Sequence, residues 1–300
     1  MPTKNSQTSV HDTMEKEPLP LVSIGVPVYN EERFLTESLE SLQAQDYGNL
    51  EIIIADNAST DNTPQICRRI AAADDRITYH RFEENCGITE NFRRTLRLSS
   101  GSYFMWAAGH DIWSSNLISE CVSLLSSEPQ AVIAFGSSQW IDDHGNPILR
   151  SSGWTDTRGM DCVGRFHSVL WGNMHPVLGL IRAEALRRAR TVIATAGSDL
   201  ILLCELVLQG HFVHATKASW YRRDHRGKET HEQRMERYQS REFGLSRSLR
   251  SKSFPLFHLP FELFKAVLRS RITWFEKMCI LFTLMPALPV RYLTVRKQQD

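Results

Sequence analysis

Two apolar runs that end abruptly in polar side chains constrain the fold of this chain more than any other feature. The first covers residues 21–28 and is followed by Tyr-Asn-Glu at 29–31. The second covers residues 52–55 and is followed by Asp56. Short runs rich in Val and Ile are typical of strands buried on both faces of a parallel sheet. Because ligands bind at the carboxyl ends of such strands, we expect a binding site there, and its polar groups suit the base and ribose of a nucleotide.

Helical and extended segments then alternate along the chain. The predicted helices, whose apolar residues recur at helical spacing, are 34–45, 63–73, 89–98, 116–126 and 200–209. Besides the two apolar runs, the predicted strands are 77–82, 103–107, 131–135, 177–182 and 211–221. This alternation predicts an α/β domain with a mostly parallel sheet and right-handed crossovers.

Three short motifs follow predicted strands, in order along the chain. They are Pro27-x-Tyr29-Asn30-Glu31, Asp56-x-x-Ser59-x-Asp61-x-Thr63, and Asn85-Cys86-Gly87 with Asn91 downstream. On these motifs, residues from roughly 20 to 225 resemble a family 2 glycosyltransferase. The resemblance implies the GT-A fold, a Rossmann-like α/β domain in which a mixed, mostly parallel sheet is flanked by helices.

Composition and the resemblance together divide the chain into three parts. Residues 1–19 are polar and lack the apolar core of a signal peptide, so we expect a disordered N-terminal tail. Residues 20–226 are the expected GT-A glycosyltransferase domain. Residues 227–300 are expected to form a charged linker followed by a helical C-terminal segment.

Apolar and basic residues interleave from residue 254 to the end of the sequence. The longest uncharged stretch, residues 278–290, is too short to span a bilayer, and Pro286 and Pro289 interrupt it. The composition suits a segment that lies in a membrane interface, which would make the protein peripheral at the cytoplasmic membrane face. A helical cap that packs on the catalytic domain or on a dimer partner explains the same pattern, and the sequence leaves both open.

The resemblance implies an enzyme of the hexosyltransferase kind. It would transfer a sugar, with inversion, from a nucleotide-diphosphate donor to a saccharide or lipid-linked acceptor in polysaccharide and glycan biosynthesis. One alternative is a catalytically impaired nucleotide-sugar-binding module of the same fold. Another is a nucleotidyltransferase, which would want a loop rich in glycine and lysine after the first strand.

Charge and cysteine content bear on the partners of the chain and on the redox state of its compartment. The formal net charge of +1 gives no electrostatic reason to expect nucleic acid as a partner. The six cysteines are scattered, with no CxxC pair, which is typical of free thiols in a reducing compartment. We therefore expect a cytoplasmic location.

The donor nucleotide is expected to bind where the first strands end. The residues that the resemblance assigns to it are Pro27, Tyr29, Glu31, Asp56, Asn85 and Asn91. Asp56 would accept a hydrogen bond from the edge of the base. The alternative for Asp56 and Asp61 is that they only cap turns and the helix that starts near Thr63.

The leaving diphosphate needs positive charge, which the family supplies with a divalent metal bound after the fourth strand. The usual acidic motif is reduced here to His110-Asp111, so we expect these two residues to bind the metal, together with His225. A mixed nitrogen and oxygen site favours Mn²⁺ over Mg²⁺. Arg222 and Arg223 are expected to pair with the diphosphate. The alternatives are that His110 and Asp111 only cap the next helix, and that the charges after the last strand face solvent.

A carboxylate must also take the proton of the acceptor hydroxyl. The resemblance assigns this role to Asp199, in the segment Thr195-Ala196-Gly197-Ser198-Asp199 that opens a predicted helix. The alternative is that Ser198 or Asp199 is only the N-cap of that helix.

Overall fold

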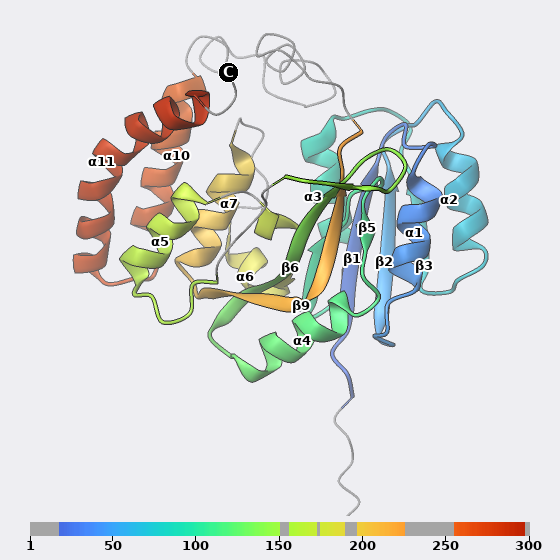
Figure 1. Ribbon diagram of the computed structural model, residues 1–300, viewed down its shortest axis with the longest axis horizontal. Helices are drawn as coiled ribbons and strands as arrows, with labels where there is room; N and C mark the ends of the chain where they lie inside the picture. The colour runs from blue at the N-terminus through green and yellow to red at the C-terminus, as the bar shows by residue number, and fades with distance from the viewer. Residues whose placement is uncertain (1–17, 151–155, 173–174, 190–196, 226–254, 298–300) are drawn as a thin grey trace, which may run out of the picture.

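The computed structural model describes residues 18–150, 156–172, 175–189, 197–225 and 255–297 (Figure 1). Its strands form one sheet in the order β3-β2-β1-β4-β8-β6-β9-β5, with β7 paired to β6. The strands are β1 (Val22–Val28), β2 (Leu50–Asp56), β3 (Ile77–Arg81), β4 (Tyr103–Trp106), β5 (Ile112–Trp113), β6 (Ala131–Ile141), β7 (Pro147–Ile148), β8 (Leu180–Arg182) and β9 (His211–Arg223).

The pairing is mixed but mainly parallel. Strands β3, β2, β1 and β4 run parallel to one another, and so do β6 and β9. Strand β8 pairs antiparallel with both β4 and β6, and β5 pairs antiparallel with β9. The predicted α/β fold with a mostly parallel sheet flanked by helices is confirmed.

Helices cover both faces of the sheet (Figure 1). The helices are α1 (Leu35–Gln43), α2 (Thr63–Ala71), α3 (Ile88–Leu98), α4 (Leu117–Ser127), α5 (Cys162–Trp171), α6 (Ala183–Arg188), α7 (Ser198–Val207), α10 (Pro255–Arg269) and α11 (Trp274–Lys297), with a 3₁₀ turn η1 (His175–Leu178). Side chains that alternate along β4 divide the core, because neighbouring residues of a strand point to opposite faces. Tyr103 and Met105 pack with α1 and α4, whereas Phe104 and Trp106 pack with α5, α6 and α7.

Helix α5 was not predicted from the sequence, although its signals are present. Asp161 caps it, since its Oδ1 accepts a 2.7 Å hydrogen bond from the backbone N–H of Gly164. Phe166, Val169 and Leu170 recur at helical spacing and are fully buried. The residues that precede this helix are rich in turn signals, which favour the prediction of a loop.

The register of β1 and β2 places the expected site. Val28 and Asp56 are paired as the last residues of their strands, so the two following loops leave the sheet at the same edge. Strand β4 pairs with β1 only as far as Trp106 opposite Gly25. The loop after β4, which holds His110 and Asp111, therefore begins opposite the middle of β1 and passes beside the last residues of that strand.

The C-terminal helices α10 and α11 form an antiparallel pair at one side of the molecule (Figure 1, orange and red). Helix α10 packs on α7 and helix α11 packs on α5. Leu263, Val267 and Ile280 are fully buried in the same core cluster as the helices below them. The pair therefore shares the core of the α/β domain. Among the helices of the described ranges, none combines the length and apolar character needed to cross a bilayer.

Candidate active site

The loops after β1 and β2 are hydrogen-bonded to each other. The backbone N–H of Asn30 donates to Oγ of Ser59, and the N–H of Glu31 donates to Oγ1 of Thr63. Asn30 and Ala58 have φ angles of 53° and 63°, which residues other than glycine seldom adopt. Strained backbone of this kind is concentrated at binding sites, as expected for the ends of these strands.

Asp56 is fully buried between these loops, and protein groups already contact its carboxylate. Its Oδ1 accepts a 2.8 Å hydrogen bond from the backbone N–H of Ser59, and its Oδ2 accepts one of 2.7 Å from the hydroxyl of Tyr79. The Nε of Arg81 lies 3.4 Å from the same Oδ2. Asp56 therefore stabilises the turn after β2, and its contact with a base stays a prediction.

Two asparagines connect helix α3 and its approach to the strand ends. Nδ2 of Asn91 donates to the carbonyl oxygens of Val28 (3.2 Å) and Ala55 (2.9 Å), at the ends of β1 and β2. Oδ1 of Asn85 accepts a 2.7 Å hydrogen bond from Nδ2 of Asn57. These contacts hold the edge of the expected nucleotide pocket. Pro27 and Tyr29 lie half-buried at the same edge.

Asp111 lies in the loop that follows β4 and is buried, with 2% of its surface exposed. Its Oδ2 accepts a 2.8 Å hydrogen bond from Nε1 of Trp220, and its Oδ1 accepts one of 2.9 Å from the backbone N–H of Arg223. Burial raises the pKa of this carboxyl above its usual range, against the lowering effect of these hydrogen bonds and of nearby His110. The carboxylate thus fastens the loop to β9, and it caps no helix.

Arg223 is buried, and its guanidinium is fully engaged by protein groups. Its Nε donates to the carbonyl oxygen of His110 at 3.0 Å, and its Nη1 donates to the carbonyl oxygens of Asp142 and Asp143. Its Nη2 pairs with Oε2 of Glu37 at 2.5 Å. This side chain braces three segments against one another. Its predicted contact with a diphosphate would need these bonds to open.

Glu31, His110 and His225 gather above Asp111. Nδ1 of His110 lies 3.1 Å from Oε1 of Glu31, and the rings of His110 and His225 lie 4.2 Å apart between centroids. These nitrogen and oxygen donors are of the kind that Mn²⁺ accepts. As they stand, no three His, Cys, Asp or Glu side chains in the described part of the chain are grouped so that they could hold one metal ion. The sites predicted for the metal are thus adjacent, but their arrangement is not that of a metal centre.

Asp199 lines a cavity of about 150 Å³ on the other side of Trp220. The cavity is walled by side chains from α3, β4, η1, α7 and β9, namely Phe92, Trp106, His175, Val177, Leu178, Ser198, Asp199, Leu202, Trp220 and Arg222. Helix α7 begins at Ser198, its cap residue is Gly197, and no side chain caps it. Asp199 is therefore not used as an N-cap, and its Oδ1 accepts a 3.4 Å hydrogen bond from the hydroxyl of Ser198.

The cavity also sets the protonation of its titratable residues. Solvent reaches Asp199, but the surrounding protein desolvates its carboxyl enough to raise the pKa, while the positive charge of Arg222 lowers it. Burial lowers the pKa of His175 to about 4, and Arg222 adds to that effect, so His175 is neutral at pH 7. The guanidinium carbon of Arg222 lies 4.4 Å from the ring centroid of Trp140.

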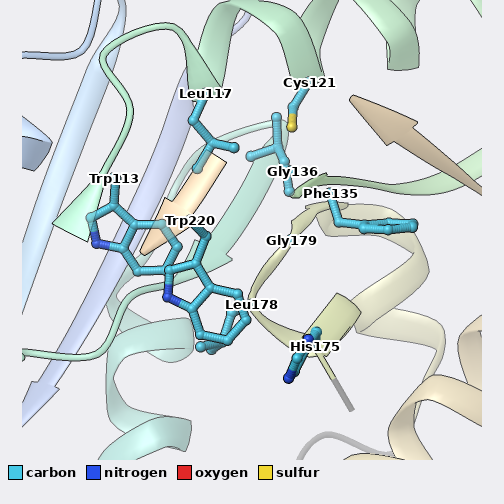
Figure 2. Close-up of a pocket in the computed structure, with 10 residues that line it drawn as sticks. Trp113, Leu117, Cys121, Phe135, Gly136, His175, Leu178, Gly179 and Trp220 are labelled. Atoms are coloured by element: carbon cyan, nitrogen blue, oxygen red, sulfur yellow. The ribbon is translucent and has the colours of Figure 1, made fainter. Parts of the chain in front are cut away.

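Aromatic side chains extend from this cavity toward β5. Figure 2 shows the rings of Trp113 and Trp220 beside each other; they are stacked with centroids 5.7 Å apart. The ring of His175 stands edge-on to Trp220 at 5.4 Å. The space that Figure 2 shows between them is only about 10 Å³. It could hold about one water at most, so it is too small for a sugar.

Sequence reasoning missed Trp220, which is central to this site. It contacts Asp111 through its indole nitrogen and lines the cavity of Asp199 with its ring. A tryptophan just before Tyr221-Arg222-Arg223 was a visible signal, but an apolar residue in a predicted strand is expected to be core.

Helix α10 reaches the start of α7 close to Asp199. A Cβ atom on Gly197 would lie 3.2 Å from Cδ1 of Leu259. Gly197 has a φ of 79°, in the region that favours glycine. The C-terminal helices therefore support the segment that presents the candidate base.

With this geometry in view, the chain can be compared with known proteins. The family model described as glycosyl transferase family 2 matches residues 23–178. The chain belongs to this family. The match covers β1 to η1, including the loops around Asp56 and Asp111, and ends before α7.

Relatives and solved structures agree with that assignment. An uncharacterized glycosyltransferase of Rickettsia felis is 31% identical over 130 residues, which are 43% of this chain and 21% of that protein. Glycosyltransferase GlyG of Streptococcus pneumoniae is 28% identical over 126 residues, 42% of each protein. These matches thus span well under half of the curated relatives' length.

The likeness to solved structures extends over more of the chain. The structure of Staphylococcus aureus TarS residues 1–349 in complex with UDP-GlcNAc superposes with a TM-score of 0.67, at 16% identity. The superposition covers 88% of this chain and 71% of that one. At this identity the likeness shows the fold, which is the one that the sequence motifs predicted.

Proposed function

We propose that this chain transfers a sugar, with inversion, from a nucleotide-diphosphate donor to a saccharide or lipid-linked acceptor. The observation that carries the proposal is that Asp199 and Arg222 line one cavity, whose wall residue Trp220 is hydrogen-bonded to Asp111. The reaction needs a base for the acceptor proton and positive charge beside the leaving diphosphate. A carboxylate and a guanidinium in one aromatic-walled cavity supply these two groups. TarS was crystallised with UDP and with UDP-GlcNAc, so UDP-sugars are the donors to test first.

In the proposed reaction, the acceptor oxygen attacks the anomeric carbon as the bond from that carbon to the diphosphate oxygen breaks. Asp199 accepts the proton that leaves the acceptor hydroxyl. Its raised pKa makes it a better proton acceptor than an ordinary carboxylate, provided that it is ionised. The electron pair of the broken bond goes to the diphosphate, whose developing negative charge Arg222 stabilises.

The two neighbouring arginines have different roles in this proposal. Arg222 faces the cavity, so we assign the diphosphate to it. Arg223 positions the loop of His110 and the backbone near Glu37, since its guanidinium is engaged there. The same change to Gln at each residue separates the two roles.

A divalent metal is part of this proposal, and Mn²⁺ is the ion we expect. Glu31, His110 and His225 carry suitable donor atoms, and both oxygens of Asp111 already accept hydrogen bonds. When bound, such an ion would supply positive charge to the leaving diphosphate. The steps above rest on the residues of the chain alone.

The first test is a screen of UDP-, GDP- and dTDP-sugars for thermal stabilisation, because a ligand that binds the native state raises its apparent stability. A stabilising donor is then offered with saccharide and lipid-linked acceptors, and transfer is measured. Stabilisation by a donor without transfer or donor hydrolysis would favour the impaired binding module, which the enclosed carboxylate of Asp111 also suggests. Absence of any donor effect would overturn the proposal.

The setting of the reaction is also proposed to be cytoplasmic. All six cysteines are free thiols, and four of them are buried. Burial raises the pKa of Cys67, Cys121 and Cys204, which keeps these thiols protonated and unreactive. This pattern suits a reducing compartment.

A further inference from the structure

Helices α10 and α11 each bury one face and leave large apolar side chains on the opposite face. On α10 these are Phe261, Phe264 and Leu268, which recur at i, i+3 and i+7. On α11 they include Phe275, Phe282 and Met285, with exposed fractions of 78%, 82% and 73%. We call these six residues the outer face. Single exposed apolar residues are ordinary, but aligned rows of this kind mark an interaction surface.

The outer face is not a gap in the packing of the core. The opposite sides of the same helices hold Leu263, Val267 and Ile280, which are fully buried against α5 and α7. Each helix is thus apolar on two sides. Packing on the catalytic domain explains the inner side and leaves the outer side unexplained.

Charge separates this region from the rest of the chain. Residues 255–297 contain seven Lys or Arg and two Glu, a net charge of +5, while the whole chain has +1. The remaining residues therefore carry −4. Of the two acidic residues, Glu262 is buried and paired with Lys265 at 2.6 Å. A positive, apolar pair of helices beside a negative domain favours an anionic partner.

A basic cavity lies where α10 turns into α11. It has a volume of about 620 Å³, and its lining includes Arg188, Arg269 and Arg271 together with one carboxylate, that of Glu205. Arg188 pairs with Glu184, whereas Arg269 and Arg271 are exposed and form no ion pair with any residue that the structure describes. Guanidinium groups match the geometry of phosphate oxygens, so this cavity suits a phosphate headgroup.

We propose that the outer face and this cavity bind the surface of a membrane that contains anionic phospholipid. The aromatic rows would enter the headgroup boundary, and Arg269 and Arg271 would contact lipid phosphates. Neither helix is both long and apolar enough to cross the bilayer, so in this proposal the helices lie on it. A second copy of this chain is disfavoured as the occupant, because two surfaces of the same positive charge would face each other.

The test is vesicle flotation of the full-length chain at low salt. Vesicles of phosphatidylcholine alone are compared with vesicles of equal parts phosphatidylcholine and phosphatidylglycerol. We expect the chain to float with the mixed vesicles only, and high salt to release it because exposed charges are then screened. A wild-type chain that stays at the bottom of the gradient with both vesicles overturns the proposal.

Three variants locate the binding surface. The double change Phe275→Glu and Phe282→Glu should abolish flotation, whereas the matched control Leu19→Glu and Leu98→Glu, at exposed apolar positions elsewhere, should float as wild type does. The double change Arg269→Gln and Arg271→Gln should weaken binding to the mixed vesicles about thirtyfold, from the usual effect of two basic residues near an anionic surface. Thermal melting of each variant verifies that it is folded.

Two outcomes would contradict membrane binding through the outer face. If the control variant loses flotation as completely as the outer-face variant, binding is not specific to these helices and the proposal is wrong. If the wild type is a dimer by light scattering, Phe275→Glu with Phe282→Glu makes it a monomer, and neither floats, the occupant is a second copy. Sugar transfer to a soluble acceptor is measured in parallel, so that failure of lipid binding is distinguished from failure of the proposed reaction.

Discussion

The indole Nε1 of Trp220 donates a 2.8 Å hydrogen bond to Oδ2 of Asp111, which lies 109 residues earlier in the sequence. This bond joins the loop after β4 to strand β9, and the two tryptophans of the β5–β9 pairing stack beside it. The same indole ring walls the cavity of Asp199. One side chain thus contacts the candidate metal residue and the candidate acceptor cavity.

Replacing Trp220 with Phe should destabilise the chain and change the site. The variant keeps an aromatic ring but leaves Oδ2 of a buried carboxylate without its donor, which costs about 1–3 kcal/mol of unfolding free energy. Thermal or denaturant unfolding measures this cost. Trp113→Phe is the matched control, since Trp113 is the other member of the same stacked pair but donates no hydrogen bond to Asp111. Equal losses in the two variants would mean that the hydrogen bond contributes nothing.

Asp199→Asn should bind the donor as the wild type does but lose transfer by about a hundredfold or more, if Asp199 supplies base catalysis. Donor-induced thermal stabilisation and the transfer rate are measured on the same sample. Glu205→Gln, a change in the same helix at a buried carboxylate, is the variant with which Asp199→Asn is compared. A variant that transfers sugar at near wild-type rates would show that another group takes the proton.

The pH dependence of transfer follows from the raised pKa of Asp199. Only the ionised carboxylate accepts a proton, so kcat/KM should fall as pH drops through that pKa, at a higher pH than for an aspartate with an ordinary pKa. Arg222 lowers this pKa, so Arg222→Gln should move the acid limb of the residual activity to higher pH. An acid limb that does not move in Arg222→Gln would contradict the assignment of either residue.

The adjacent pair Arg222 and Arg223 provides a matched comparison. Arg222→Gln should reduce transfer while the midpoint of thermal unfolding stays close to that of the wild type. Arg223→Gln should lower that midpoint, because it removes buried hydrogen bonds to three carbonyl groups and the pair with Glu37, a loss of about 2–3 kcal/mol. The opposite pattern would exchange the roles that we propose.

Metal dependence is tested by EDTA treatment followed by addition of Mn²⁺ or Mg²⁺. We expect activity to be lost and then restored, with Mn²⁺ more effective. Mn²⁺ binding measured by electron paramagnetic resonance, in the wild type and in His110→Ala, gives a readout that does not depend on activity. Full transfer in EDTA would leave Arg222 and other cations as the source of positive charge.

The sequence predicted the order of the first elements because each signal is local. The apolar run of β2 and the apolar spacing of α1 lie within the elements themselves, and their bounds differ from prediction by one or two residues. Strand β6 continues to Ile141, well beyond the predicted end at Phe135. Its polar second half is held by pairing with β9 after a register shift, and that pairing is not visible in a local pattern.

The site could be predicted less well than the fold, because its contacts join distant segments. The sequence placed Asp56 at the end of β2, His110 after β4 and Asp199 in the first turn of α7, as the structure has them. They did not reveal that Asp56 is held by Tyr79, or that Arg223 points into the protein while Arg222 lines the cavity. Which way a side chain faces depends on the partners that the fold brings to it.

The contact between Leu259 and Gly197 has a consequence for how the chain can be recombined with its relatives. The family model ends at residue 178, so α7, which carries the candidate base, and the helices that support it lie together outside the portion that the family model matches. In the proposed reaction, the donor motifs and the candidate base then lie on opposite sides of residue 178. A chimaera joined there would keep Leu259 with Gly197 and exchange the donor half intact. A chimaera joined just after β9 would take Gly197 and Leu259 from different proteins. Its α10 would then pack on an α7 from another sequence, and the contact between these two residues would be lost.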